Sequence, residues 1–204
     1  MIRLSIRSAG VAVSALALAG CALLSSPDPV QTYRFGGPAA ASAVAEGQSN
    51  LRQVTLRRVQ FPEAVEGDKI LGVTGTETAY IAGARWVSPA TDLYMESLEN
   101  AFAAQATRVR LIGPRELTRG ERSLDIDIRA FEARYEAPGA IPTVVVTARA
   151  RLLALPDRTV AAERTFTVQQ PASENRVSAI VEAFDIATRD LNTQIVGWTD
   201  ANAG

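Results

Sequence analysis

The sequence contains no histidine and a single cysteine, Cys21, and only 6% of its 204 residues are aromatic. The absence of histidine excludes Ser/His/Asp and Cys/His catalytic arrangements, as well as zinc sites that contain histidine. One cysteine cannot form an intramolecular disulfide or a cysteine metal cluster. We therefore expect no metal, no cofactor and no enzyme activity.

Neither sign of charge dominates, because 21 lysine and arginine residues stand against 22 aspartate and glutamate residues, for a net charge of −1. Such a chain has no overall basic field with which to hold a nucleic-acid backbone, so we expect no nucleic-acid partner. A hydrophobic content of 47% with 21% charged residues is typical of one globular domain with a core.

The apolar run at the N-terminus is too short to cross a bilayer. It covers 16 mostly apolar residues, 9–24, whereas a transmembrane helix needs about 18 to 20. Arg3 and Arg7 precede it, and a positive region before a short apolar stretch is typical of a secretory signal. We interpret residues 1–20 as a signal peptide.

The signal peptide ends in Leu18, Ala19 and Gly20, and with Cys21 this run resembles a bacterial lipobox. In a lipobox the cysteine thiol receives a diacylglyceryl group, and cleavage makes the cysteine the first residue. The alternative is an ordinary signal peptide with a chance cysteine. Ala22 follows rather than aspartate, which by resemblance to lipoprotein sorting rules favours the periplasmic face of the outer membrane. We expect Cys21 to carry acyl chains that anchor the protein without spanning the membrane.

The remaining chain divides by composition into a tether and a domain. Residues 21–50 are rich in serine, proline, glycine and alanine, which indicates a flexible tether, with one short strand near residues 31–35. Residues 51–204 alternate between apolar patterns and turn residues without an internal repeat. We interpret them as a single periplasmic domain.

Alternating apolar residues predict three long strands, at 123–135, 143–155 and 159–168. The apolar phase of the first shifts near Ala130, which predicts a bulge. A turn at Pro156 joins the other two into a hairpin. Shorter strands are predicted at 53–61, with a bulge at Arg57–Arg58, and at 70–73, 78–86 and 109–112.

Two amphipathic helices are predicted. The first begins with Ser88 as N-cap and Pro89 at the first helical position and ends near Thr107. The second runs from about Ser173 to Asp200 with one apolar stripe. The fold class is therefore α+β, a mainly antiparallel sheet with both helices packed on one face.

Asp125 and Asp127 form a candidate chemical site, because residues two apart on a strand point to the same face. Such a pair could serve acid–base chemistry or bind a cation. The alternative, which we favour, is a solvated strand face in which Arg129, Arg149 and Arg151 form ion pairs with these carboxylates.

Aromatic and arginine side chains are the candidates for contacts with a partner, since tyrosine, tryptophan and arginine are enriched at the centres of interfaces. The alternatives are core positions for the aromatic residues and a solvated pair for the arginines. The six candidates are Tyr33, Arg57, Arg58, Tyr80, Trp86 and Trp198.

The order of several short motifs resembles that of a known family, over nearly the whole mature chain. The motifs are the lipobox at Cys21, a strand containing Tyr33, a strand reaching Arg57–Arg58, Tyr80 followed by Arg85–Trp86, a helix after Ser88–Pro89, the strand from Leu124 to Phe131, the hairpin of 144–155 and 159–168, and a last helix ending in Trp198. In this order the chain resembles the ABC-type transport auxiliary lipoproteins, the family that includes the lipoprotein of the paraquat-inducible Pqi system.

The resemblance implies a non-enzymatic part of an envelope transport system. It implies an outer-membrane lipoprotein that works with an inner-membrane permease and ATPase and with an MCE-type periplasmic substrate-binding protein. Such systems move phospholipids or other hydrophobic molecules between membranes. The chain itself has no P-loop with which to hydrolyse ATP, and whether it forms a homo-oligomer is left open.

Two other functions fit the same tether and domain. An accessory lipoprotein for outer-membrane assembly would act on lipopolysaccharide or barrel proteins, and co-purification with an MCE-type protein would distinguish it. A periplasmic lipid carrier would enclose a large apolar cavity.

Overall fold

The computed structural model describes residues 30–37, 51–114, 116–118 and 120–203. The chain divides after Val30 into two units, and the second, Gln31–Gly204, contains the fold. The predicted signal peptide and lipobox, with Leu18, Ala19, Gly20 and Cys21, lie outside the described residues. Within the described ranges no helix combines the length and apolarity that crossing a bilayer requires.

An eight-stranded sheet and three helices make up the described fold. In chain order the elements are β1 Gln31–Tyr33, β2 Arg52–Gln60, α2 Glu63–Glu66, β3 Lys69–Thr74, β4 Glu77–Trp86, α3 Ala90–Gln105, β5 Val109–Ile112, β6 Arg122–Tyr135, β7 Thr143–Ala154, β8 Thr159–Pro171 and α4 Val177–Asn202.

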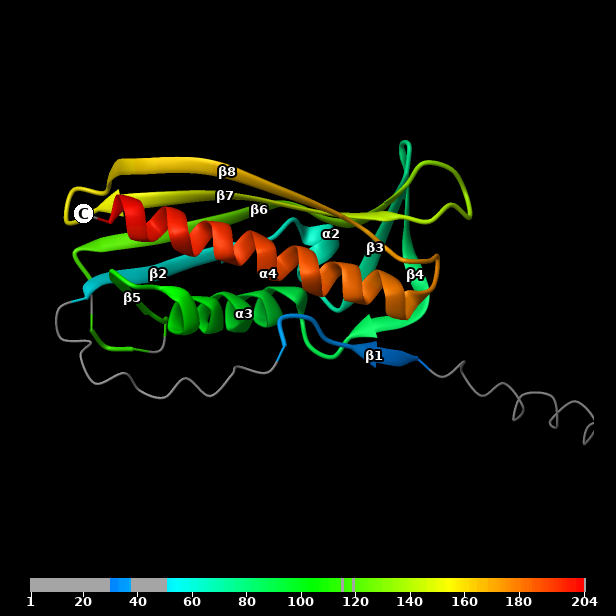
Figure 1. Ribbon diagram of the computed structural model, residues 1–204, viewed down its shortest axis with the longest axis horizontal. Helices are drawn as coiled ribbons and strands as arrows, with labels where there is room; N and C mark the ends of the chain where they lie inside the picture. Colours follow the sequence, from blue (N-terminus) through cyan, green and yellow to red (C-terminus); the bar gives the residue numbers. More distant parts are fainter. Residues whose placement is uncertain (1–29, 38–50, 115, 119, 204) are drawn as a thin grey trace, which may run out of the picture. The chain divides into compact units, whose positions relative to one another are not determined.

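Strand β6 is the centre of the sheet. On one side it pairs antiparallel with β7, which pairs antiparallel with β8. On its other side lie β2 and β3, both parallel to it; β5 lies beside β2, β4 beside β3 and β1 beside β4. Helices α3 and α4 lie on the same face of the sheet (Figure 1). The predicted α+β class is confirmed, and the parallel pairings of β1, β2, β3 and β5 make the sheet mixed.

The predicted bulge of β6 is present, since the register with β7 shifts between Ile128 and Ala130. The inserted residue, Arg129, is exposed. Because one extra residue reverses the alternation, both Ile128 and Phe131 are buried, each with 1% exposure. The bulge therefore lets the helix-facing side of β6 remain apolar along the strand.

Helix α4 buries its predicted apolar stripe but begins later than predicted. Its residues Ile180, Phe184, Leu191 and Ile195 are at most 1% exposed, and the helix packs on β7, β8 and α3. The prediction of a start near Ser173 was wrong, because β8 continues through Pro171 and the backbone N–H of Ala172 donates to the carbonyl of Pro142. The chain then bends over residues 173–176, and α4 begins only at Val177.

The start of α3 also differs from the prediction. Pro89, rather than Ser88, is the N-cap, and no side chain caps the helix. The N–H of Ala90 donates instead to the carbonyl of Gly67 at 2.9 Å. A backbone acceptor from the preceding loop thus satisfies a donor for which the sequence indicated a serine side chain.

A cluster of aromatic rings fills the space between the helices and the sheet. The ring of Phe131 lies 4.8 Å from that of Phe184, 5.1 Å from that of Phe35 and 5.5 Å from that of Phe61, centroid to centroid. Trp86 lies 4.9 Å from Phe35 and 5.4 Å from Phe184. Edge-to-face and tilted pairs of this kind stabilise a core beyond the area that they bury.

Tyr94 of α3 extends this cluster with a buried polar group. Its ring packs edge-on against Phe61 at 5.6 Å. The side chain is fully buried, and its hydroxyl has no hydrogen-bond partner among the described residues. Burial raises the pKa of Tyr94 well above its ordinary value.

We expect Tyr94→Phe to protect the fold at alkaline pH. The folded state must keep the phenol protonated, while the unfolded chain ionises above about pH 10, so stability is present below that pH and is lost as the pH rises above it. The wild type should lose up to about 1.4 kcal/mol per pH unit through this residue, measured by urea unfolding at several pH values.

Tyr80→Phe is the matched control, because it removes a tyrosine hydroxyl from a side chain that is 45% exposed. It should retain the alkaline loss of the wild type. If the free energy of unfolding of Tyr94→Phe falls with pH as steeply as that of the wild type, the Tyr94 phenol ionises without cost in the folded state.

Candidate functional site

Two of the predicted partner-binding residues, Tyr33 and Trp86, lie opposite each other where β1 pairs with β4. The carbonyl of Tyr33 accepts the N–H of Val87, and the Tyr33 side chain is half-buried. Trp86 is only 2% exposed. The prediction of a partner contact at Trp86 is therefore corrected to a core position, because its ring belongs to the aromatic cluster.

The other aromatic candidates lie apart from this pair. Tyr80 donates its hydroxyl to the carbonyl of Ala64 at 3.2 Å, and the ammonium of Lys69 lies 4.7 Å from its ring centroid. It lines a shallow hollow of about 290 Å³ on β3 and β4. Trp198 of α4 is half-buried, with its ring 5.9 Å from that of Phe166. The candidates do not form one site.

Arg57 is held by a carboxylate of the predicted acidic pair. The register of β2 shifts between Leu56 and Arg58, and Arg57 is the residue inserted by this bulge. Its Nε donates to Oδ1 of Asp125 at 2.8 Å and its Nη2 donates to Oδ2. The hydrogen bond with Asp125 raises the pKa of Arg57. Arg58, the other arginine candidate, is exposed.

Asp125 differs from the solvated residue that the alternation predicted, because it is only 2% exposed. Arg57 covers it from one side, and Nη2 of Arg151 lies 3.7 Å from its Oδ2 on the other. A buried carboxylate costs free energy unless a charge partner and hydrogen bonds compensate it, and these two arginines supply that compensation.

Ion pairs continue across the same sheet face, which faces away from the helices. Asp127 lies 2.6 Å from Nη2 of Arg129, and Arg149 donates to Glu163 of β8 at 2.7 Å. The hydrogen bond with Arg149 lowers the pKa of Glu163. This arrangement matches the ion-paired face that we favoured over acid–base chemistry. Among the described residues no group of three or more acidic side chains could hold a metal ion.

We expect Arg57→Ala to destabilise the domain by about 1 to 3 kcal/mol, because it leaves a buried carboxylate with one distant partner. Arg58→Ala, the exposed neighbour, should change stability by no more than about 0.5 kcal/mol. Urea unfolding of both variants measures the difference, and equal effects would show that the Asp125 pair does not stabilise the fold.

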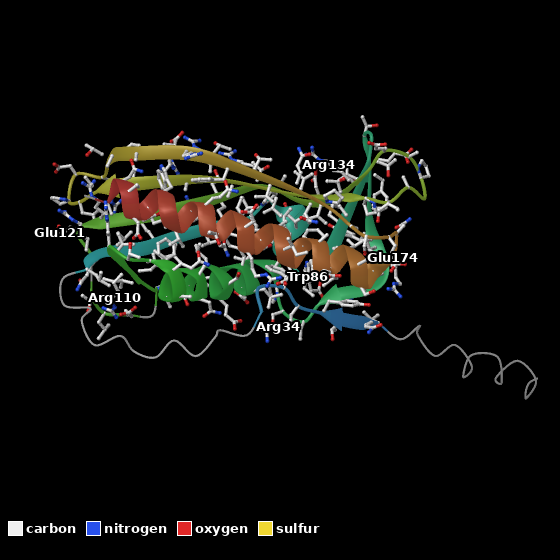
Figure 2. All side chains as sticks on the ribbon, viewed as in Figure 1. Arg34, Trp86, Arg110, Glu121, Arg134 and Glu174 are labelled. Atoms are coloured by element: carbon white, nitrogen blue, oxygen red, sulfur yellow. The ribbon has the colours of Figure 1, made fainter. Side chains whose placement is uncertain are left out.

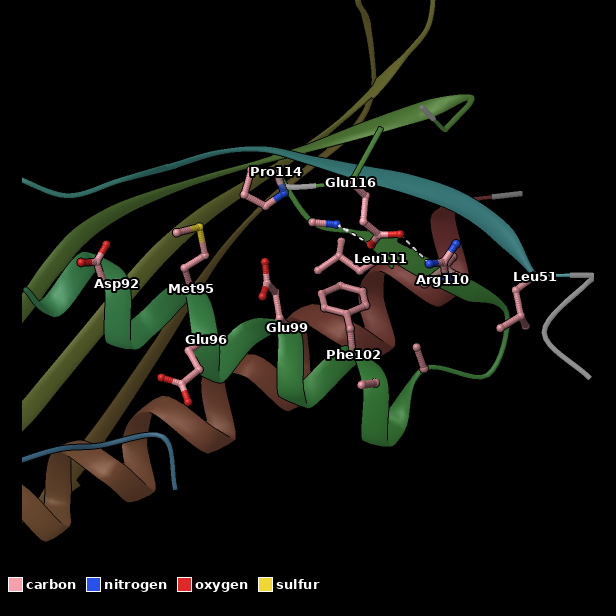
Figure 3. A pocket seen from close by; sticks show the side chains of 14 residues that line it. Leu51, Asp92, Met95, Glu96, Glu99, Phe102, Arg110, Leu111, Pro114 and Glu116 are labelled. Atoms are coloured by element: carbon pink, nitrogen blue, oxygen red, sulfur yellow. Dashed lines mark hydrogen bonds and ion pairs between the residues drawn. The ribbon is translucent and has the colours of Figure 1, made fainter. Parts of the chain in front are cut away.

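A groove of about 600 Å³ between α3 and β5 is the larger of the two hollows described. Figure 3 shows Phe102 and Glu99 pointing from α3 towards Leu111 and Glu116. Its apolar lining comprises Leu51, Met95, Phe102, Ala103, Ala106, Val109, Leu111 and Pro114. These side chains form an apolar floor of the groove at the edge of the sheet.

Acidic side chains surround this floor. Asp92, Glu96, Glu99 and Glu116 line the groove, with Arg110 as the one basic residue of the lining. Two of these carboxylates have arginine partners, because Glu116 pairs with Arg110 and Glu96 pairs with Arg34, whose Nη2 lies 3.3 Å from its Oε1.

Specific contacts fix the end of the groove nearest Arg110. Nη2 of Arg110 donates to Oε2 of Glu116 at 2.5 Å, and Oε1 of Glu116 accepts the N–H of Gly113 at 3.1 Å. A Cβ at Gly113 would lie 2.9 Å from Oε1 of Glu99, so a side chain there would displace that carboxylate. Arg34 and Arg110 lie near opposite ends of α3 (Figure 2).

Our sequence interpretation missed this groove. The available signal was the spacing of Asp92, Glu96 and Glu99, which at i, i+4 and i+7 places three carboxylates on one helix face. A stripe of this kind usually indicates a solvated face. Only the position of β5 at the sheet edge turns it into the wall of a groove.

Solved structures show the same fold. A Xanthomonas campestris protein of the family DUF330 is 26% identical, with a TM-score of 0.66 over 86% of this chain and 95% of that one. An uncharacterised protein is 13% identical, with a TM-score of 0.63 over 83% of this chain and 98% of that one. A hypothetical protein from Chlamydia trachomatis is 9% identical, with a TM-score of 0.51 over 74% of this chain and 97% of that one.

A search of curated proteins gives no match. The model of the family described as "ABC-type transport auxiliary lipoprotein component" matches residues 33–196, which cover α3, α4 as far as Val196 and all but the first two residues of the described strands. The chain therefore belongs to the ABC-type transport auxiliary lipoprotein family.

Proposed function

We propose that this protein is a non-catalytic docking component of an ABC transport system that moves phospholipids or other hydrophobic molecules across the periplasm. Acyl chains on Cys21 anchor it to the periplasmic face of the outer membrane. Its partners are an MCE-type periplasmic substrate-binding protein and, through it, an inner-membrane permease and ATPase. The family membership supports the transport role.

The aromatic cluster is the observation that favours docking over carrying. A lipid carrier would hold its cargo between helices and sheet, and in this domain Phe131, Phe184 and Trp86 occupy that space with rings about 5 to 6 Å apart. Interiors packed in this way leave no room for an acyl chain without displacing core side chains. The surface then remains for function, and the groove between α3 and β5 is the larger of the two hollows described on it.

We expect Cys21 to be the acylated first residue of the mature protein. Mass spectrometry of the purified protein should find diacylglyceryl on Cys21 and no peptide from residues 1–20. Cys21→Ser should release the protein from membranes, because one or more acyl chains supply the anchoring free energy. Ser25→Ala, four residues on, should stay anchored, and full membrane retention of Cys21→Ser would contradict lipid anchoring.

We expect the full-length protein, carrying an affinity tag at its C-terminus, to capture an MCE-type protein from detergent-solubilised membranes. Lipid extracts of the purified chain should contain no phospholipid in stoichiometric amount beyond the anchor. Capture of lipopolysaccharide-assembly or barrel-assembly proteins instead would favour the assembly function. One bound phospholipid per chain would favour the carrier function.

A further inference from the structure

We propose that one end of the domain rests on the surface of a zwitterionic lipid bilayer. This end, which we call the hairpin end, consists of the β3–β4 hairpin over residues 73–82 and the loop of residues 136–142. The contact rests on the proposed anchoring through Cys21, because it needs a domain that is held at a membrane. The observations that support it are the direction of β1, the exposed uncharged surface of the hairpin end and the charges beside that surface.

The direction of β1 places the hairpin end nearer to an anchor at Cys21. β4 begins at the hairpin turn, where Glu77 pairs with Thr74, and β1 runs parallel to β4. β1 therefore also begins on the side of the hairpin end, towards the right of the view in Figure 1. Ten positions separate Cys21 from Gln31, so the chain between them spans at most about 35 Å. Of the two ends of the sheet, the hairpin end is the one that such an anchor holds nearer to the membrane.

The strand β4 gives the hairpin end an exposed surface without charge. Residues 78–84 contain no charged side chain, and all of them except Ile81 and Ala84 are exposed. Tyr80 is 45% exposed, and with Tyr135 it lines the hollow of about 290 Å³ on β3 and β4. Tyrosine is enriched at the boundary of bilayers, where one end of the side chain meets apolar groups and the other meets polar groups. This surface is therefore suited to the headgroup region of a bilayer.

The loop of residues 136–142 adds an exposed aliphatic side chain, Ile141, with 56% exposure. The loop follows β6 at the point where β6 ends beside β3. Its backbone is held in place, because Nδ2 of Asn175 donates to the carbonyl of Gly139 at 3.1 Å. An apolar side chain on a loop that is already ordered enters a headgroup layer with little further loss of conformational entropy.

The opposite end of the sheet has a more strongly charged surface. The loop of residues 136–142 at the hairpin end contains one charged residue, Glu136. The described loops at the opposite end expose Arg108, Glu116, Glu121, Asp157 and Arg158. Charged side chains resist transfer out of water, so the hairpin end is the better suited of the two to an apolar boundary.

The charges beside the uncharged surface select the kind of lipid. Two arginines near the hairpin end are already paired, Arg134 with Glu132 and Arg176 with Glu174, each at 2.7 Å. Glu77 and Glu136 add two further exposed carboxylates, so the excess charge at this end is negative. An anionic bilayer would repel this excess. A bilayer of zwitterionic headgroups is therefore the surface that fits.

The test uses the full-length protein reconstituted in phosphatidylcholine vesicles, with and without a lipid that carries a doxyl quencher close to the headgroup. A single introduced cysteine carries a fluorophore, and under the proposed acylation Cys21 has no free thiol to compete for the label. Thr76→Cys and Ile141→Cys place the label at the hairpin end. Val160→Cys is the matched control, because Val160 is also 56% exposed and lies at the other end of β7, about 35 Å along the sheet.

We expect the doxyl lipid to quench the labels of Thr76→Cys and Ile141→Cys at least about fivefold more strongly than the label of Val160→Cys, because an interfacial contact buries side chains only about 5 to 10 Å deep. Replacing about half of the phosphatidylcholine by phosphatidylglycerol should weaken this quenching, since the excess charge of the hairpin end is negative.

A charge substitution locates the contact. Ile141→Glu in the protein labelled at Thr76→Cys should lower the quenching at least about twofold, because a carboxylate resists entry into the bilayer surface. Val160→Glu introduces the same charge at the opposite end and should leave the quenching unchanged. Thermal unfolding confirms that both variants fold.

Equal quenching of the Ile141→Cys and Val160→Cys labels, in protein that floats with the vesicles, would overturn the inference while the anchoring stands. Quenching that Ile141→Glu leaves unchanged, or that phosphatidylglycerol strengthens, would overturn it as well. If the protein does not float and Cys21 takes up the fluorophore, the proposed anchoring fails and the contact fails with it. If the quenching is as expected but the protein captures no MCE-type protein, the proposed transport role fails and the membrane contact stands.

Other occupants of the hairpin end would give different results, each of which overturns the inference. Self-association that Ile141→Glu abolishes, without quenching by the doxyl lipid, would identify a second copy of the chain as the occupant. Loss of MCE-type protein capture on Ile141→Glu, again without quenching, would identify that protein as the occupant.

Discussion

Phe131 of β6 is the contact on which the interior depends. Its ring lies against rings from the segments after β1 and β2, from β4 and from α4. It reaches them only because Arg129 is inserted as a bulge, since without the extra residue the alternation of β6 would turn Phe131 to the opposite face. One inserted residue thus decides where α4 can pack, and α4 in turn forms the surface on which α3 rests.

The segment after β1 is fastened to the same interior. Phe35 is 1% exposed, and the N–H of Gly36 donates to Oδ1 of Asp185 on α4 at 2.8 Å. Gly36 has a φ of +85°, and a Cβ there would lie 2.6 Å from Cβ of Ser97, so only glycine fits between the helices. Under the proposed anchoring, the chain from Cys21 would enter the domain through β1, which pairs with β4, before Phe35 and Gly36 contact the core and α4.

Patterns within one element predicted the structure well, and pairings between distant elements were not predictable. The alternation of 123–135, its bulge near Ala130 and the apolar stripe of α4 follow from side-chain periodicity, which acts locally. The parallel pairings of β2 and the burial of Phe35 depend on segments far apart in the chain, on which periodicity carries no information. The prediction of a solvated Asp125 was wrong for the same reason, because Arg57 on β2 and Arg151 on β7 cover its side chain.

The two charged surfaces of the domain are both stabilised by ion pairs. On the outer sheet face, each of Asp125, Asp127 and Glu163 already has an arginine partner, so a ligand there would have to break an existing pair for each one that it formed. At the groove between α3 and β5, Glu116 pairs with Arg110 and Glu96 pairs with Arg34. A new cation there would compete with these existing pairs, as it would on the sheet face. The ion pairs of both surfaces thus join neighbouring elements: β2, β6, β7 and β8 on the sheet face, and α3 with the segment after β1 at the groove.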